Sequence, residues 1–272
     1  DVTGPPESRI VMSSRILELP GTTASFRVSN DGESLAFLGQ IPRSTLWRLV
    51  RREDGPGFDA NPIWGGTVLA SGPKIRPGGD ELAFLAGTFE TTRIYRLSFS
   101  GGEPEPMTEV GFGKAFLAWS PDGSELAFGA DDDGREQLRI VSTIDGSDRP
   151  VPGAEGRAYL DWMGDGRILF HSFQDDNRNF RLVSPSGDDQ RPLFDPPRNG
   201  TLFQVAASHS GQKLAVAGAR GGRTEIDAWL VSPDSPEETL LFEGTAMPIT
   251  WSDDDEWVYL VRETRESRFL GE

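Results

Sequence analysis

Hydrolytic chemistry is the first to consider, because Ser208, His209 and Ser210 stand together in the chain. A serine nucleophile needs a base that reaches its hydroxyl, and neighbouring residues in a turn seldom aim their side chains at one another. The Gly-x-Ser-x-Gly elbow that presents the serine of many hydrolases does not occur in the sequence. We therefore interpret the three residues as part of a turn. We expect a protein without catalytic residues of its own, not an enzyme.

Metal binding is the second chemistry to consider. The sequence has two His and no Cys, which excludes a site rich in imidazole or thiolate, and we expect a structural or rim role for His171. Three acidic runs, at 131–133, 175–176 and 253–255, offer the oxygen ligands that calcium prefers. None of them has the alternating spacing of a calcium-binding loop. We interpret them as solvated loops and expect no cofactor, with calcium kept as the alternative.

The charge and hydropathy of the chain exclude two kinds of partner. Asp and Glu number 43 against 27 Lys and Arg, which gives a formal net charge of −16. A nucleic-acid-binding protein needs a basic surface instead. The longest apolar runs, such as 82–87, have about six residues, far fewer than the roughly eighteen of a membrane-spanning helix. We expect no nucleic-acid partner and no insertion into a membrane.

A short pattern recurs along the whole chain, and its clearest copy runs from Leu117 to Phe128. In each copy an apolar segment leads into a turn of Pro or Gly with Asp or Asn, and a second apolar segment follows. The pattern predicts a β-hairpin repeated six times. Trp119, Trp162 and Trp251 precede the turn in three copies and are expected to pack between neighbouring repeats. The last bulky residues of the six copies, 42 to 47 positions apart, are Phe37, Phe84, Phe128, Phe170, Val216 and Tyr259.

Two further strands follow each hairpin. The third consists of aromatic and β-branched residues, as in 94–97 and 138–141. The fourth contains Pro, as in 103–107, 149–152 and 191–194. Since Pro has no N–H to donate, it is tolerated where one side of a strand is open. We predict that the fourth strand is the exposed outer edge of each repeat.

Six repeats of four antiparallel strands predict an all-β chain that folds as one six-bladed β-propeller domain over residues 1–272. A two-sheet sandwich would not repeat the same turn at a fixed interval. The last repeat has a third strand at 267–270 but no fourth, and 14–20 matches the outer-strand pattern. We therefore expect this N-terminal strand to pair into the last blade and close the ring. The expected blades are approximately 22–66, 67–109, 110–153, 154–196, 197–244, and 245–272 with 14–20.

The turn Ser120-Pro121-Asp122-Gly123, followed by 125–128, resembles the repeat of TolB-like propellers. These belong to a WD-like class that is also found in tricorn-type and prolyl-oligopeptidase propellers. The resemblance spans essentially the whole chain and implies a bacterial protein in a periplasmic or other extracytoplasmic location. Similar propellers also serve as extracytoplasmic sensors of bacterial Ser/Thr kinases. Because function resides in sites placed on a fold, the resemblance is specific for the fold and not for one activity.

One face of such a propeller collects the loops between second and third strands and the loops that lead into each first strand. Here these loops carry Arg, acidic residues and a few aromatics, the composition of a surface that recognises proteins or peptides. We predict that a protein or peptide binds this face around the central channel, and that the chain is a monomer. The candidate contact residues, called the rim residues below, are Arg93, Phe112, Lys114, Asp132, Arg135, Arg157, Tyr159, Asp176, Arg178, Arg223 and Arg265.

The sequence thus favours a non-catalytic binding or sensing module. The first alternative is a propeller domain of a larger enzyme or receptor, either the extracytoplasmic sensor of a Ser/Thr kinase or the gating domain of a peptidase. The second alternative is a calcium-dependent hydrolase.

Overall fold

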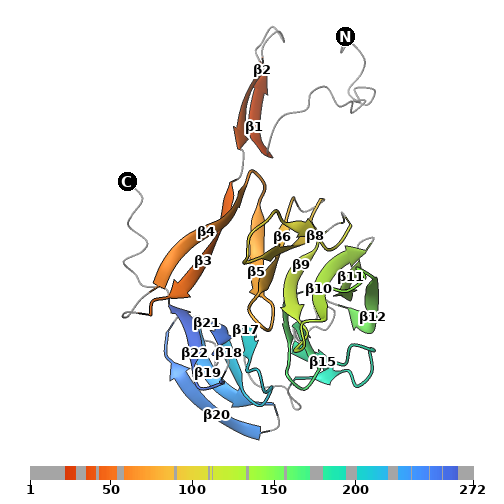
Figure 1. The fold of residues 1–272 in the computed structure, drawn as a ribbon. Coiled ribbons are helices and arrows are strands. Elements are labelled where there is room, and N and C mark those ends of the chain that lie inside the picture. Colours follow the sequence, from red (N-terminus) through yellow and green to blue (C-terminus); the bar gives the residue numbers. More distant parts are fainter. Residues whose placement is uncertain are drawn as a thin grey trace, which may run out of the picture. The chain divides into compact units, whose positions relative to one another are not determined.

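The protein is described by a computed structural model, in which the chain forms two compact units, Asp1–Leu69 and Ala70–Glu272 (Figure 1). All the regular elements among the described residues are β-strands, as the sequence predicts. The described residues are 22–28, 35–40, 43–53, 58–88, 91–109, 111, 113–132, 135–155, 158–171, 180–193, 201–219, 226–233, 235–244, 246–252 and 254–262.

The N-terminal unit contains the four strands expected for the first blade, but they do not form one sheet. Strand β1 (Thr22–Val28) pairs with β2 (Leu35–Gln40), and β3 (Ser44–Arg51) pairs with β4 (Phe58–Gly66). Among the described residues the four strands form two hairpins, and the expected first blade over 22–66 stays a prediction.

The C-terminal unit contains four sheets of four antiparallel strands, each built from strands consecutive in the chain. A fifth, two-stranded sheet, β21 (Ala246–Trp251) and β22 (Val258–Arg262), follows them. The first sheet consists of β5 (Ala70–Ile75), β6 (Glu81–Ala86), β7 (Arg93–Ser98) and β8 (Glu105–Pro106), and the second of β9 (Ala115–Trp119), β10 (Glu125–Asp132), β11 (Arg135–Ser142) and β12 (Asp148–Glu155). The third sheet consists of β13 (Ala158–Trp162), β14 (Ile168–His171), β15 (Phe180–Val183) and β16 (Arg191–Pro192). The fourth consists of β17 (Thr201–Ala207), β18 (Leu214–Ala219), β19 (Asp227–Ser232) and β20 (Ser235–Phe242).

The Pro-containing strands lie where the sequence places them. β8, β12 and β16 are each the last strand of their sheet and pair with one neighbour only. β8 and β16 are only two residues long, which leaves little exposed edge for pairing with another chain. The expected strands at 14–20 and 267–270 lie outside the described residues.

The core lies between successive sheets. Strands β6, β10, β14 and β18 are almost entirely buried, as expected of strands that are covered on both faces. Ala83 and Ile94 of the first sheet share one cluster with Leu117 and Phe128 of the second. Further clusters join the second sheet to the third, the third to the fourth, and the fourth to β21 and β22. The sheets therefore pack face to face in chain order.

Candidate partner-binding face

The strand pairing fixes which loops share an end of each sheet. At one end, the loop between the second and third strands joins Ala86 to Arg93 in the first sheet, and Asp132 to Arg135 in the second. The segment that leads into each first strand reaches the same end. The turns between first and second strands, such as Ser120–Glu125, lie at the opposite end. We call these the rim end and the turn end.

Three rim residues are described with their side chains, and all three lie at the rim end. Arg93 is the first residue of β7, Lys114 directly precedes β9, and Arg135 is the first residue of β11. Asp132 and Tyr159 are described by backbone alone, Asp132 paired with Arg135 and Tyr159 within β13. The remaining rim residues lie outside the described residues: Phe112, Arg157, Asp176, Arg178, Arg223 and Arg265.

The structure brings Arg93 and Lys114 together from two neighbouring sheets. An isolated bridge pairs Thr92 with Gly111 and thereby holds the segment before β9 against the start of β7. The guanidinium Nη2 of Arg93 lies 3.7 Å from a carboxylate oxygen of Glu109, whose side chain is 98% exposed. An ion pair so open to water contributes little to stability. The Arg93 Nε is buried and finds no hydrogen-bond acceptor among the described residues.

Lys114 is half-buried, and its amine lies over Gly111, in the space that a Cβ would otherwise occupy. Burial lowers the pKa of Lys114, Asp148 opposes that shift, and the guanidinium groups of Arg139 and Arg93 reinforce it. No carboxylate lies within ion-pair distance of Lys114 in the part of the chain that the structure describes. Two cations thus lie near each other, with the exposed carboxylate of Glu109 beside Arg93.

A further feature of this end was missed by the sequence reasoning. Each first strand carries a β-bulge, and in β9 the extra residue is Phe116, with φ of +50° and 40% of its surface exposed. A bulky residue with positive φ is unusual, and bulges often redirect a side chain next to a functional site. The only signal in the sequence is an aromatic residue two positions after Lys114. The bulges of the other first strands, where the register of pairing shifts, lie between Thr23 and Ser25, Ser71 and Lys74, Ala158 and Asp161, Leu202 and Gln204, and Pro248 and Thr250.

At the turn end, Ser208 acts in a turn, as the sequence predicts. Its hydroxyl accepts a hydrogen bond from the amide of Lys213 at 3.1 Å, and the side chain is buried. Ser120 and Ser252 accept the equivalent bond, from the amides five residues later, at 2.9 Å. The shared geometry explains Ser208 as the serine of a repeated turn.

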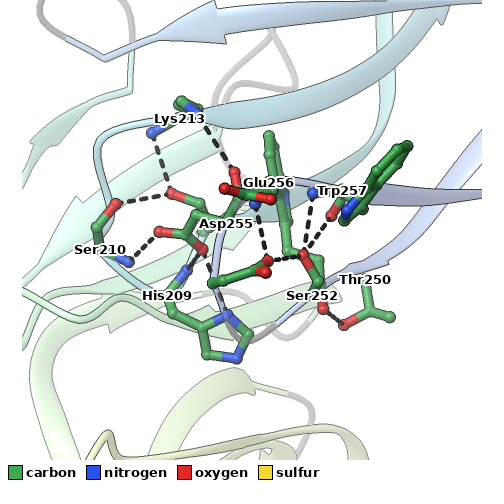
Figure 2. A network of polar contacts seen from close by, with 12 residues as sticks. His209, Ser210, Lys213, Thr250, Ser252, Asp255, Glu256 and Trp257 are labelled. Atoms are coloured by element: carbon green, nitrogen blue, oxygen red, sulfur yellow. Dashed lines mark hydrogen bonds and ion pairs between the residues drawn. The ribbon is translucent and has the colours of Figure 1, made fainter.

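His209 belongs to a contact between two turns (Figure 2). Its amide and that of Ser210 donate to the two carboxylate oxygens of Asp255, at 2.7 and 2.9 Å. The Nζ of Lys213 donates to the carbonyl of Asp255 at 3.3 Å. Asp255 therefore fastens the β17–β18 turn to the β21–β22 turn.

All three equivalent tryptophans pack between neighbouring sheets, as predicted, and two of them also donate a hydrogen bond to the neighbouring sheet. The indole of Trp119 donates to the carbonyl of Lys74 and that of Trp251 to the carbonyl of Ala206, both at 2.9 Å. Trp162 is buried as well, but its indole donates to Gly166 of its own turn at 3.1 Å. This turn is one residue shorter than its equivalents, so its own carbonyl is within reach.

The remaining candidates for chemistry have modest contacts. His171 is buried at the end of β14 and packs edge-on against Phe180, with ring centroids 5.1 Å apart. In the described ranges, no three acidic or imidazole side chains lie close enough together to hold a metal ion. No helix suited to crossing a membrane occurs among the described residues.

Comparison with known proteins identifies the kind of fold. No family model matches the chain. A TolB homolog of Chlorobium luteolum is 26% identical over 148 residues, which are 54% of this chain and 34% of that protein. The match therefore spans about a third of the length of this relative.

Solved structures extend the likeness over most of the chain. A protein from Agrobacterium tumefaciens described as TolB superimposes with a TM-score of 0.66 and 21% identity, over 89% of this chain and 90% of that one. TolB from Acinetobacter baumannii gives a TM-score of 0.67 and 15% identity, over 81% and 58%. Enzymes occur among the neighbours too, such as a puromycin-hydrolyzing peptidase of Mycobacterium tuberculosis with a TM-score of 0.54 and 15% identity, over 81% and 38%.

Proposed function

We propose that this chain, whose fold is that of the TolB-like β-propellers, is a non-catalytic module that binds a protein or peptide at its rim end. The observation that carries the proposal is the meeting of Arg93 and Lys114 at the rim end of two adjacent sheets. Phe116 adds an exposed aromatic side chain two residues further on. Arginine and aromatic side chains are enriched where proteins recognise one another.

The proposal includes six blades that close into a ring, with 14–20 supplying the outer strand of the last blade. Support comes from four consecutive four-stranded sheets with the same internal order. The strands before and after them, β1 to β4 and β21 to β22, provide further hairpins of the same repeat. Apolar side chains on these hairpins are open to water, among them Trp47 of β3 and Tyr259 of β22. A closed ring would cover such surfaces.

The test of the function is recovery of a natural partner from an extract of the source bacterium's envelope. Charge reversal at Arg93 and Lys114 together, to Glu, is expected to reduce recovery at least fivefold, because both cations would be replaced by anions at the binding face. Lys213→Glu is the matched control, since Lys213 belongs to the turn end and is exposed. Undiminished recovery by the double variant, or equal loss with the control, would argue against the rim end as the binding face.

A second function is favoured by the enzymes among the structural neighbours. In this alternative the propeller is one part of a longer peptidase or receptor, and it controls access of a substrate or reports a ligand to another domain. The full-length gene product decides between the two: a peptidase or kinase domain on the same polypeptide supports the alternative. We further propose an extracytoplasmic location and a monomeric state, which fractionation of the cell and light scattering would test.

A further inference from the structure

The cation pair at the rim end is unusual in a chain with a net charge of −16. Acidic residues outnumber basic ones, yet Lys114 is close enough to Arg93 for the two positive charges to oppose each other. Like charges placed together cost free energy unless an anion lies between them. The carboxylates of Asp148 and Glu109 offset part of this repulsion, but Glu109 approaches Arg93 only to 3.7 Å and is open to water.

Arg93 and Lys114 both offer donors at this place, and the Arg93 side chain as a whole is 34% exposed. The Arg93 Nε–H is buried and has no acceptor among the residues that the structure describes. A buried polar group without a partner is costly, so a shift of the Arg93 side chain that brings its Nε–H to a ligand oxygen would be favoured. The Lys114 amine occupies the space above Gly111, where any other residue would place a Cβ. Because Gly111 has no side chain, the Lys114 ammonium group can lie directly against its backbone.

We propose that Arg93 and Lys114 together form a site for a carboxylate group of an acidic peptide segment. This inference rests on the proposed function and names the chemistry that its face recognises. A guanidinium and an ammonium match the two oxygens of one carboxylate. With Arg139, Asp148 and Glu109 also near Lys114, the five side chains carry a net charge of about +1, which suits a monoanion better than a phosphate dianion. The exposed Phe116 provides apolar surface for a neighbouring residue of the same peptide.

The three lysines of the chain, Lys74, Lys114 and Lys213, make the site directly observable. Reductive methylation with ¹³C-labelled formaldehyde gives each lysine its own NMR signal in the full chain, and Lys114→Arg assigns the signal of interest. The probe is the peptide Gly-Glu-Leu-Glu-Gly, acetylated and amidated. Its Gln counterpart and inorganic phosphate at the same ionic strength are the comparisons.

We expect saturable shifts of the Lys114 signal with the Glu peptide and an increase in the pKa of this amine by roughly half a unit to one unit, because a bound carboxylate favours the charged form. The Gln peptide should leave the signal unchanged. Arg93→Gln should weaken binding of the Glu peptide at least fivefold. Arg96→Gln is the matched control, since Arg96 lies on the same strand and already binds Glu105 at 2.7 Å.

Several results would overturn the assignment. Equal response of Lys213 would mean that the peptide binds without selecting this site. Phosphate that binds as tightly as the Glu peptide would show an anion site with no preference for carboxylate. If Arg93→Gln fails to fold, Gly111→Ser serves instead, because it displaces the Lys114 amine without changing charge, and unchanged peptide binding by that variant would contradict the proposed geometry. The two proposals can fail separately. If the wild type binds the Glu peptide but the Arg93 and Lys114 double Glu variant captures the natural partner undiminished, the carboxylate site is supported and the proposed function is contradicted.

Discussion

At the scale of single residues, polar side chains that suggest chemistry serve the backbone at the turn end. In the turn that begins at Ser120, Asp122 accepts bonds from the Ser120 hydroxyl at 2.7 Å and from the Ser124 amide at 3.0 Å. The Ser120 hydroxyl, followed by the amide and hydroxyl of Ser124, lowers the pKa of Asp122 to about 2. A carboxylate so well supplied with donors replaces backbone hydrogen bonds that the reversal of the chain leaves unmade.

Among the glycines at the rim end, Gly87 is the one whose replacement should lower the stability of the fold most. It has a φ of +127°, and a Cβ there would lie 2.5 Å from the carbonyl oxygen of Thr91. Gly87→Ala is therefore expected to lower the free energy of unfolding by about 2 kcal/mol or more, through strain and a backbone clash. Denaturation by urea measures the loss.

Gly101→Ala is the matched control for this substitution. Gly101 also has a positive φ, of +104°, but nothing lies within 4 Å of a Cβ there. Gly101→Ala should lower the free energy of unfolding by only about 1 kcal/mol, because only the backbone conformation is unfavourable for alanine. Equal losses for the two variants would mean that the clash with Thr91 is relieved at no cost.

At the scale of elements, the strands could be predicted from the sequence, while the bulges and the connection from β2 to β3 could not. The alternation of apolar residues around the repeated turn identifies strands such as β9 and β10, because burial on both faces demands it. A bulge depends on the pairing of two strands, so Phe116 gives no sign of its φ in the local sequence. The division of β1 to β4 into two hairpins likewise depends on which strands pair, and not on the local sequence of any one of them.

The candidate site was predictable only in part, for a related reason. Charge and loop position identify Arg93 and Lys114 as rim residues. Their proximity arises from the bridge between Thr92 and Gly111, which are 19 positions apart in the chain. No local pattern encodes such a contact. The role of Ser208 could be predicted, because its place in the repeat matches that of Ser120.

Substitution of Asp255 tests the contact between the β17–β18 turn and the β21–β22 turn (Figure 2). Asp255→Ala should lower the free energy of unfolding by about 1–3 kcal/mol at pH 7, because the amides of His209 and Ser210 lose their acceptors. Partial burial favours a raised pKa for Asp255, but hydrogen bonds from Ser210 and His209 outweigh it and lower the pKa. Thermal and urea denaturation at several pH values measure both effects.

The sign of the pH dependence follows from that lowered pKa. A carboxyl group whose pKa is lower in the folded chain stabilises it above the pKa of the unfolded chain, about 4, and this stabilisation is lost as the pH falls further. The difference between the wild type and Asp255→Ala should therefore shrink below about pH 4. Asp254→Ala is the comparison for the contact between turns: the Asp254 side chain bonds within its own turn, and because its pKa is lowered too, the same pH dependence is expected without loss of that contact. A constant difference down to pH 2 would contradict the role given to the Asp255 carboxylate.

At the scale of the whole molecule, closure of the ring is the step on which the proposed binding face depends. In an open series of sheets, the first and last members each expose one apolar face to water, whereas in a ring every sheet has two neighbours. Trp47 and Leu49 of β3 are 58% and 62% exposed, and Tyr259 of β22 is 55% exposed. Burial of such side chains contributes about 1.5–3 kcal/mol each, so a closed ring should be substantially more stable than an open series.

Removal of residues 1–20 tests the closure that we propose. If 14–20 forms the outer strand of the last blade, its loss should lower Tm by about 5 °C or more, since each kcal/mol moves Tm by about 2–4 °C in a chain of this size. Removal of residues 1–10 alone is the matched control, because it shortens the chain without touching that strand, and its Tm should equal that of the full chain. Exchange of amide hydrogens adds a local measurement: protection of 258–262 should fall in the longer deletion only. Equal Tm values for both deletions, with protection of 258–262 unchanged, would show that the ring closes without the N-terminal strand or does not close at all.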